Sequence, residues 1–430
     1  MTIRLAKSAF CIGLLACLMA CGACLAFADD SSQEAADPAY KNMLDNPKKV
    51  VYANNQVAYY NIAKKGGHKF VQAAYVDANK DGKYQAGEKA QVVGFKAYPK
   101  SQTAYFKYKG LRYYTRDVEN RDNKNGDFLK QTYKGNKTKT VILPRQVIKV
   151  KGGFEPGSNT TINATGATIK GTKKKINLIK LNSANGKKPI KNVKFKGGTW
   201  QTAEKNGSTS SSTFSVVCAK NITFDHMKVN CSSQYYCMQI FGSSHVKVTN
   251  CKITAAGSWK KTYLKGAIRI DSSFGLSKKA DKKRPCTHIT IANNTILGNS
   301  AISVNQWDPN YTGVYHKKIT IKNNKLTAKG SGAPCINMSN AAGFTITGNT
   351  IKSKSGNGIE VGNYGKRSSA YAKSTGTISK NTIKAKKRSI APTTWAKSVK
   401  AKKLVISHNK MKKVSKAQMH KIARSVTIKK

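Results

Sequence analysis

Arg269 and Asp271 are the residues whose types and spacing best fit a chemical role, and both lie in the stretch "AIRID" that begins at Ala267. Side chains two residues apart on a strand leave the same face, so the guanidinium and the carboxylate would stand side by side. On an acidic glycan, a base and a cation at this spacing fit proton abstraction beside a uronate carboxylate. Asp271 also fits one half of the carboxyl pair, roughly 5 to 10 Å apart, that glycoside hydrolases use. The plain alternative is an inert ion pair at the surface.

A second candidate site is the stretch "DANKDGKYQAGE", Asp77 to Glu88, which matches the twelve-residue calcium-loop pattern D-x-[DN]-x-[DN]-G-x5-E. The ligands would be the side chains of Asp77, Asn79, Asp81 and Glu88 and the backbone carbonyl of Lys83, with Gly82 at the sharp turn. The flanking segments are strand-like, so we expect a calcium loop between strands that stiffens the protein and takes no part in catalysis. The alternative is a metal-free hairpin turn at Asp81-Gly82.

An internal repeat is the strongest indication of the elements that position these residues. Phrases such as "ITIANNTI" at 289, "ITIKNNKL" at 319 and "FTITGNTI" at 344 each join a strand of period two, a polar turn and an aliphatic residue. Their alignment places one residue per repeat in a common column: Gly198, Met227, Cys251, Asn294, Asn324, Asn349, Asn381 and Asn409. The longest interval, between Cys251 and Asn294, contains Arg269 and Asp271.

Repeats made only of strands and turns cannot bury an apolar face alone, so stacked coils are expected. The result is a parallel β-helix in which strands of neighbouring coils lie about 4.8 Å apart. The asparagine column then forms a ladder in which each side chain bonds its equivalent in the next coil.

These phrases, with "TVILPRQVIKVKGG" and "TTINATGATIKG" near residue 150, make the sequence similar to the right-handed parallel β-helix proteins of the pectate-lyase-like superfamily, particularly secreted surface proteins of Gram-positive bacteria. The resemblance covers about residues 141–430 and implies an all-β, right-handed, single-stranded solenoid. This scaffold hosts lyases, hydrolases, phage depolymerases and adhesins, so the resemblance does not specify an activity. Related surface proteins tend to carry Glu where this chain has Gly266, and His where "VNQWDPN" stands, and both departures weaken a catalytic interpretation.

A second strand follows each polar turn, and its alternation predicts which residues face solvent. One predicted outward column is Gln239, Arg269, Ser303, Asn337 and Glu360, and the next is Asp271, Asn305, Ser339 and Gly362. Asp271 and Glu360 would be three coils, about 14 Å, apart. Asp308 is therefore the better second carboxyl group. The candidate catalytic residues are Arg269, Asp271 and Asp308, and the candidate substrate-binding residues are Asn305, Trp307, Asn337, Glu360 and Gln239.

The aromatic residues Trp307, Tyr311 and Tyr315, with His316, follow the same coil and suit sugar faces, with packing of the loop against the coils as the alternative. The other histidines of this region, His226, His245 and His288, are expected as turn residues. The six cysteines after residue 100 are expected as small buried core residues, with one or two disulfides as the alternative.

Residues 1–28 have the features of an export signal, with Arg4 and Lys7 before an apolar run and Ala26-Phe27-Ala28 as a cleavage site. A lipoprotein signal with Cys21 or Cys24 is the alternative. Residues 29–45 are expected to form a linker, residues 46–135 a small tyrosine-rich β module of antiparallel strands, and residues 140–430 the β-helix. We expect a secreted, cell-wall-associated protein without a membrane-spanning segment.

The net charge of +58 on 430 residues comes from 77 basic residues, mostly lysine, against 19 acids. Lysine favours broad adhesion to polyanions, whereas Arg is the residue of bidentate recognition. The expected partner is an anionic cell-wall polymer or acidic polysaccharide, with no specific nucleic acid. Two functions remain open: binding of acidic polysaccharide or teichoic acid, and cleavage of an acidic glycan by a polysaccharide lyase or glycoside hydrolase around Arg269 and Asp271.

Overall fold

The computed structural model describes residues 46–65, 68–92, 105–115, 139–150, 155–172, 177–182, 189–202, 212–231, 236–255, 266–273, 284–304, 315–364, 374–393, 398–412 and 414–429. The predicted export signal and linker lie outside these ranges.

Three long and mainly parallel sheets make up most of the described structure. The 9-stranded sheet consists of β10 (Ile179–Asn182), β13 (Phe214–Val217), β16 (Met238–Phe241), β19 (Gly266–Asp271), β22 (Ser300–Val304), β25 (Ile336–Ser339), β28 (Ile359–Tyr364), β31 (Ile390–Pro392) and β32 (Ser398–Val399). The 10-stranded sheet consists of β7 (Val147–Val150), β9 (Thr168–Gly171), β12 (Thr199–Gln201), β15 (Lys228–Cys231), β18 (Lys252–Ala255), β21 (Thr295–Gly298), β24 (Lys325–Ala328), β27 (Thr350–Ser353), β30 (Thr382–Ala385) and β34 (Lys410–Met411).

The 13-stranded sheet is the longest and reaches both ends of the coil stack. It consists of β4 (Tyr105–Tyr108), β5 (Leu111–Tyr114), β6 (Lys139–Ile142), β8 (Thr160–Asn163), β11 (Lys191–Lys196), β14 (Lys220–Asp225), β17 (Ser244–Thr249), β20 (Thr287–Ala292), β23 (His316–Lys322), β26 (Ala341–Thr347), β29 (Thr375–Ser379), β33 (Ala401–Ser407) and β35 (Ala423–Lys429).

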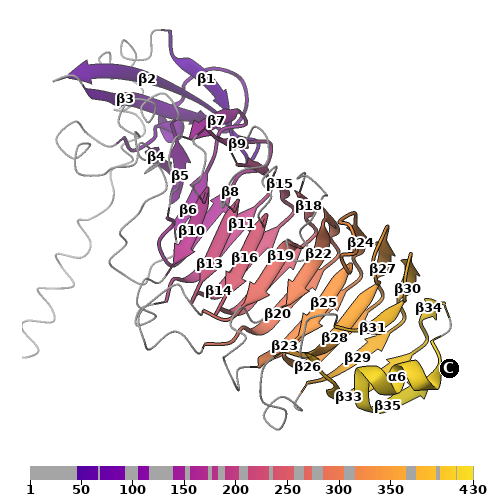
Figure 1. Cartoon of the computed structure of the whole chain (residues 1–430). Coiled ribbons are helices and arrows are strands. Elements are labelled where there is room, and N and C mark those ends of the chain that lie inside the picture. Colours follow the sequence, from indigo (N-terminus) through magenta and orange to yellow (C-terminus); the bar gives the residue numbers. More distant parts are fainter. Residues whose placement is uncertain are drawn as a thin grey trace, which may run out of the picture.

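Strand order shows that these sheets belong to one solenoid. Consecutive strands β14, β15 and β16 enter three different sheets, and β17 then pairs in parallel with β14 to begin the next coil. The coils stack along one axis (Figure 1). The predicted parallel β-helix is therefore confirmed.

The core fills the inside of the coils. Alternate strand residues point inward and are buried, as in β11 and β14, whose valine, isoleucine and phenylalanine side chains join one continuous cluster. Near the N-terminal end, Phe195 stacks on Phe224 at a centroid separation of 5.3 Å and meets Trp200 edge-on. All six described cysteines are buried, which confirms their prediction as core residues.

The predicted asparagine ladder is confirmed and fixes one corner of the coils. Nδ2 of Asn294 donates to Oδ1 of Asn324 at 2.9 Å, and the same bond recurs from Asn324 to Asn349, from Asn349 to Asn381 and from Asn381 to Asn409. Each Oδ1 also accepts from the backbone N–H of the preceding asparagine. Since all of these amides except that of Asn409 are buried, the ladder satisfies polar groups that would otherwise oppose stacking.

The N-terminal residues form a small module that is continuous with the solenoid. β1 (Lys48–Val51), β2 (Val57–Lys65) and β3 (His68–Asp77) make an antiparallel sheet. β4 and β5 form an antiparallel hairpin, turning at Lys109-Gly110. β5 then pairs in parallel with β6, so the 13-stranded sheet runs from the β-helix into the module.

The C-terminal end is covered by a short helix that we did not predict. α6 (Lys416–Ile422) begins with a capping box, in which Ser415 accepts from the backbone N–H of Gln418 and the Gln418 side chain accepts from that of Ser415. Met419 and Ile422 join the solenoid core. The helix and β35 lie at the end of the stack opposite the three-stranded sheet (Figure 1), where a solenoid requires a cap.

Candidate functional site

The 9-stranded sheet holds the predicted outward columns in the expected register. Gln239 pairs with Arg269, Arg269 with Ser303, Ser303 with Asn337, and Asn337 with Glu360. Their neighbours in sequence point to the opposite side, into the hydrophobic core. The sequence therefore correctly predicted which residues of these strands lie on the same side of the sheet.

The prediction that this column faces solvent is wrong. Gln239 and Arg269 are each 5% exposed, Asn337 and Glu360 each 1%, and Ser303 is fully buried. Asp271, Ser339 and Gly362 of the second column are buried as well. Strand alternation determines which side of the sheet a residue occupies, but it does not determine whether another part of the molecule covers that side.

Arg269 and Asp271 form a buried ion pair whose third member is Tyr236. Nε of Arg269 donates to Oδ2 of Asp271 at 3.0 Å, and a second guanidinium nitrogen contacts the same oxygen. The guanidinium also donates to the hydroxyl of Tyr236 and lies over that ring, 4.9 Å from its centroid. Oδ1 of Asp271 accepts from the backbone N–H of Ser272 at 2.8 Å. The ion pair predicted as the alternative to chemistry is present, but it is buried and not at the surface.

The electrostatics of the pair follow from its burial. Burial raises the pKa of Asp271, against the opposing effects of Arg269 and His316. Burial acts to lower the pKa of Arg269, but Asp271 and Tyr236 outweigh it and raise that pKa, so Arg269 remains a cation. Removing either partner would leave the other group buried and uncompensated, which is costly.

The other polar residues of this sheet differ in how many of their polar atoms form hydrogen bonds. Asn357 donates to the carboxylate of Glu360 at 2.7 Å, and Ser339 donates to Oδ1 of Asn337 at 2.7 Å. Within the described ranges, Oγ of Ser303 and Nδ2 of Asn337 have no hydrogen-bond partner. The other predicted site residues, Asn305, Trp307 and Asp308, lie outside the described residues, so the carboxyl pair Asp271–Asp308 stays a prediction.

Gly266 has no space for the glutamate that the resemblance would place there. A Cβ atom at this position would lie 2.8 Å from Oγ of Ser303 and 3.0 Å from the carbonyl oxygen of Ile268. Tyr315 and His316 do not offer a sugar-stacking surface either, since they are 6% and 0% exposed. Nδ1 of His316 accepts from the backbone N–H of Cys286 at 3.1 Å. For these two residues the packing alternative is correct.

The solvent-facing side of the 10-stranded sheet is lined by lysines, and we call it the lysine face. Its exposed lysines are Lys149, Lys170, Lys228, Lys252, Lys325, Lys352, Lys384 and Lys410. No strand of this sheet contains Asp or Glu. Three pairs of these lysines are direct partners on neighbouring strands: Lys149 with Lys170, Lys228 with Lys252, and Lys352 with Lys384.

The 13-stranded sheet carries a second set of exposed basic residues. They include Lys191, Lys194, Lys196, Lys220, Lys247, Lys317, Lys318, Lys322, Lys402 and Lys403. Lys191 and Lys220 are again direct partners. Among the described β-helix residues, the acids that reach solvent are Glu155 and Asp225, because Asp271 and Glu360 are buried.

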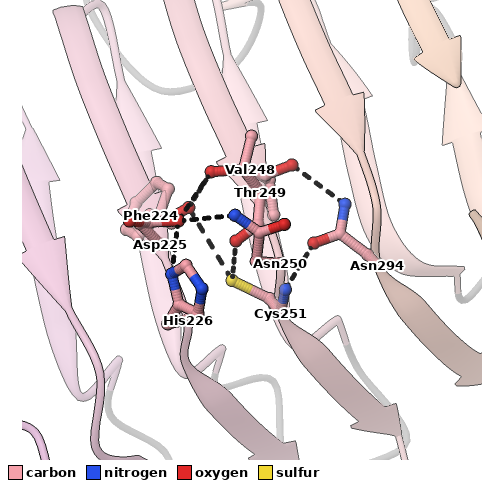
Figure 2. Close-up of polar contacts among 8 residues, drawn as sticks. All are labelled: Phe224, Asp225, His226, Val248, Thr249, Asn250, Cys251 and Asn294. Atoms are coloured by element: carbon pink, nitrogen blue, oxygen red, sulfur yellow. Dashed lines mark hydrogen bonds and ion pairs between the residues drawn. The ribbon is translucent and has the colours of Figure 1, made fainter. Parts of the chain in front are cut away.

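The carboxylate of Asp225 is held by neighbouring side chains. Oδ1 accepts from Thr249 at 3.1 Å and from Asn250 at 3.0 Å, and lies 2.9 Å from Nδ1 of His226 (Figure 2). Burial acts to raise the pKa of Asp225, but the contacts with Asn250, His226 and Thr249 outweigh it and lower that pKa. The same view shows the end of the asparagine ladder, where Oδ1 of Asn294 accepts from the backbone N–H of Cys251 at 2.8 Å.

His245 and His288 continue an outer row of residues with positive φ that begins with Asn159, Asn192 and Asn221. Nδ2 of Asn192 donates to Asn159 at 2.8 Å and that of Asn221 to Asn192 at 3.0 Å, and the rings of His245 and His288 stack 4.5 Å apart. His226 and His408 also have positive φ. Of the three histidines predicted as turn residues, His226 lies at the bend that follows β14, whereas His245 and His288 lie within β17 and β20.

The predicted calcium loop follows β3 and ends in the short helix η1 (Ala86–Glu88). Gly82 adopts the left-handed conformation expected at the sharp turn, with φ of 77°. Oδ1 of Asn79 accepts from the backbone N–H of Asp81, and Oδ1 of Asp81 accepts from that of Lys83. Among the described residues, no three His, Cys, Asp or Glu side chains are gathered closely enough to hold a metal ion as they stand.

Comparison with known proteins adds a weak structural likeness. No protein-family model matches the sequence and no curated protein matches it. A solved structure described as the Streptococcus pneumoniae surface protein and adhesin PfbA has a TM-score of 0.38 and 17% identity, covering 67% of this chain and 88% of that chain. Another, described as the surface adhesin PfbA of the same organism, has a TM-score of 0.40 and 16% identity, covering 66% and 83%. Likenesses this weak carry no argument about function, and the resemblance to the pectate-lyase-like superfamily stays a prediction.

Within the described ranges, no helix is long and apolar enough to span a membrane.

Proposed function

We propose that this chain is a cell-surface β-helix protein that binds linear anionic polymers, either acidic polysaccharide or teichoic acid. The observation that carries the proposal is the pairing of Lys228 with Lys252, and of three further lysine pairs, directly across neighbouring strands on solvent-facing sides of the solenoid. A polymer lying along the axis would meet cations repeated at multiples of the strand spacing, about 4.8 Å.

The energetics of these pairs support a bound anion. Like charges placed directly opposite each other on a sheet destabilise it. The lysine pairs therefore lower the free energy of unfolding of the solenoid. Other coils have threonine at the equivalent position, as at Thr295 and Thr350, and avoid this repulsion. An anionic polymer would remove the repulsion, because each phosphate or carboxylate neutralises cations on adjacent strands.

The residue type also indicates how selective the binding is. Lysine is a mobile point charge, and it lacks the planar fork that lets Arg recognise one anion geometry. We therefore expect carboxylate and phosphate polymers to bind with similar strength. Because the charges are exposed, binding should weaken steeply as the salt concentration rises.

A location outside the cytoplasm is part of the same proposal. Its support is the predicted export signal of residues 1–28, and teichoic acids and acidic polysaccharides are polymers of cell surfaces. A wall-associated protein would meet both polymers at this location.

The alternative function, cleavage of an acidic glycan, finds no favouring observation in the described part of the chain. Arg269 and Asp271 are 5% and 1% exposed and bond to each other, so a polymer cannot contact them in this arrangement. Asn305, Trp307 and Asp308 would decide the matter, and they lie outside the described residues.

The test is a binding series with the purified protein on polygalacturonate, polyglycerol phosphate teichoic acid and neutral dextran, each over a range of sodium chloride concentrations. Polymer length and the ultraviolet absorbance of unsaturated uronate products are followed in the same samples. We expect binding to both anionic polymers, none to dextran, loss of binding at high salt and no change in length. Equal binding to dextran would contradict the proposal, and shortening of polygalacturonate would establish the alternative.

A further inference from the structure

Asp77 and Glu88, the first and last residues of the predicted calcium loop, are buried carboxylates with unused oxygens. Asp77 is 2% exposed and Glu88 4% exposed. Oδ1 of Asp77 and Oε2 of Glu88 are buried and have no hydrogen-bond donor among the described residues. Buried carboxylates are ordinarily paired with a cation, fully hydrogen-bonded or bound to a metal, so these two oxygens require an explanation.

Within the part of the chain that the structure describes, no cation supplies it. The chain has 77 basic residues, yet the ion pairs found among the described residues are His226–Asp225 and Arg269–Asp271. Neither pair includes Asp77 or Glu88.

The other oxygen of each carboxylate accepts a hydrogen bond from the backbone of the same loop. Oδ2 of Asp77 accepts from the backbone N–H of Gly82 at 3.1 Å, and Oε1 of Glu88 accepts from that of Ala78. Both carboxylates are therefore bonded to the backbone between positions 78 and 82. The hydroxyl of Tyr75 donates to the carbonyl of Gly82 at 3.4 Å on the same loop.

We propose that the loop from Asp77 to Glu88 binds one calcium ion, with Oδ1 of Asp77 and Oε2 of Glu88 as its buried ligands. The remaining ligands are the oxygens of Asn79 and Asp81 and the carbonyl of Lys83, an all-oxygen set of the kind that Ca²⁺ prefers. The carboxylate of Asp81 now accepts from the side chains of Asn79 and Gln85, at 3.0 and 2.9 Å, in exposed hydrogen bonds. Binding exchanges these weak surface bonds for coordination, so the site closes around the ion as it binds.

The position of the loop indicates what the ion does. The residues just after it form single bridges to both neighbouring sheets, Lys89 with Tyr75 of β3 and Gln91 with Lys107 of β4. Ala90 and Gln91 donate to the carbonyls of Ala74 and Lys107 at 2.9 and 2.8 Å. Calcium would therefore fix the segment that joins the N-terminal sheet to the solenoid.

The most direct probe is Tb³⁺, which replaces Ca²⁺ at oxygen sites and emits when a nearby tyrosine is excited. Tyr75 and Tyr84 lie beside the loop, with ring centroids 5.4 Å apart. The purified protein is titrated with Tb³⁺, and Ca²⁺ or Mg²⁺ is then added as competitor. The variants Asp77→Asn and Glu88→Gln are compared with Asp225→Asn, which removes an acid outside the loop. Calorimetry with Ca²⁺ alone measures the stoichiometry, and the thermal midpoint is recorded with Ca²⁺ and with chelator.

We expect sensitised emission that Ca²⁺ displaces and Mg²⁺ does not, with one Ca²⁺ per chain and a dissociation constant of about 10⁻⁴ to 10⁻³ M, as in extracellular modules. Glu88→Gln and Asp77→Asn should weaken binding at least about tenfold, while Asp225→Asn leaves it unchanged. Ca²⁺ should raise the midpoint of the wild type and not that of the loop variants. Absence of saturable Ca²⁺ binding, or equal binding by Glu88→Gln in its folded state, would overturn the proposal without bearing on polymer binding.

Discussion

Lys228 and Lys252 are Cα partners on the neighbouring parallel strands β15 and β18, and both side chains are exposed. Residues in this relationship on a sheet interact directly, and two like charges repel. The lysine face contains three such pairs, and this arrangement connects the stability of the solenoid with the polymers that we propose it binds.

The repulsion within the pair predicts a stabilising substitution. Lys252→Gln should raise the free energy of unfolding by a few tenths of a kcal/mol at low salt. The gain should disappear at high salt, where the charges are screened. The matched control is Lys325→Gln, because Lys325 is also exposed but lies opposite Thr295 and Thr350. Urea unfolding at two salt concentrations measures both effects, and an equal gain in the control would contradict the explanation.

The asparagine ladder predicts a position-dependent cost of truncation. Asn324→Ala removes the acceptor of two donors of Asn294 and the donor to the carbonyl of Ile291, all buried. The cost should be about 3 kcal/mol, since each buried group left without a partner costs about 1 to 3 kcal/mol. Asn409→Ala, at the half-buried end of the ladder, should cost about a third as much. Equal thermal midpoints for the two variants would show that the ladder is not a buried network.

The buried pair of Arg269 and Asp271 should act in folding and not in binding. Arg269→Ala and Asp271→Ala should each destabilise the protein by about 3 to 5 kcal/mol, because the remaining charge stays buried. The double variant Arg269→Met/Asp271→Leu should recover much of that loss. Thermal unfolding measures the cost, and polymer binding is measured well below the midpoint. Loss of polymer binding in the folded double variant would show that this pair takes part in binding and would contradict the prediction.

Lys139 predicts a pH-dependent difference in stability. Burial first, and then Arg112, lower the pKa of Lys139 to about 8, whereas an unfolded lysine titrates near 10.4, roughly two units higher. Below pH 8 the folded state carries a buried charge that the unfolded state holds in water, so the charge opposes folding. As the pH rises from about 8 to about 10.4, that penalty is lost.

Lys139→Met should therefore stabilise the protein at pH 7, and its advantage over the wild type should shrink as the pH rises through this range. Unfolding midpoints of the two proteins from pH 7 to pH 10.5 give the comparison. A constant difference across the range would show that the pKa of Lys139 is not lowered.

The repeat made most of the fold predictable from the sequence. Asn294, Asn324 and Asn349 recur at one point of similar phrases, and one stack of coils explains both their spacing and their burial. The register of Gln239, Arg269 and Ser303 was predictable for the same reason, since a strand has a period of two. Helix α6 was missed because its seven residues contain too few apolar positions to show a helical period.

The environment of the candidate site was less predictable. Arg269 contacts Tyr236, 33 residues away in the preceding coil, and no local pattern marks that tyrosine as a partner. The burial of Asn337 and Glu360 depends on what covers the sheet, which the alternation of a strand does not encode. The lysine pairs could have been predicted from the sequence, because aligning "MKVN" and "CKIT" places Lys228 beside Lys252.

The measurement that tests the central claim most directly compares two variants of equal net charge. One removes four lysines of the lysine face, Lys228, Lys252, Lys352 and Lys384, each replaced by Gln. The other replaces Lys48, Lys49, Lys64 and Lys65 of the N-terminal module in the same way. Binding to teichoic acid and to polygalacturonate at one fixed low salt concentration should fall at least about tenfold in the first variant, with a shallower salt dependence, and little in the second. Equal losses in the two variants would show that net charge alone attracts the polymer, and would contradict a binding face on the solenoid.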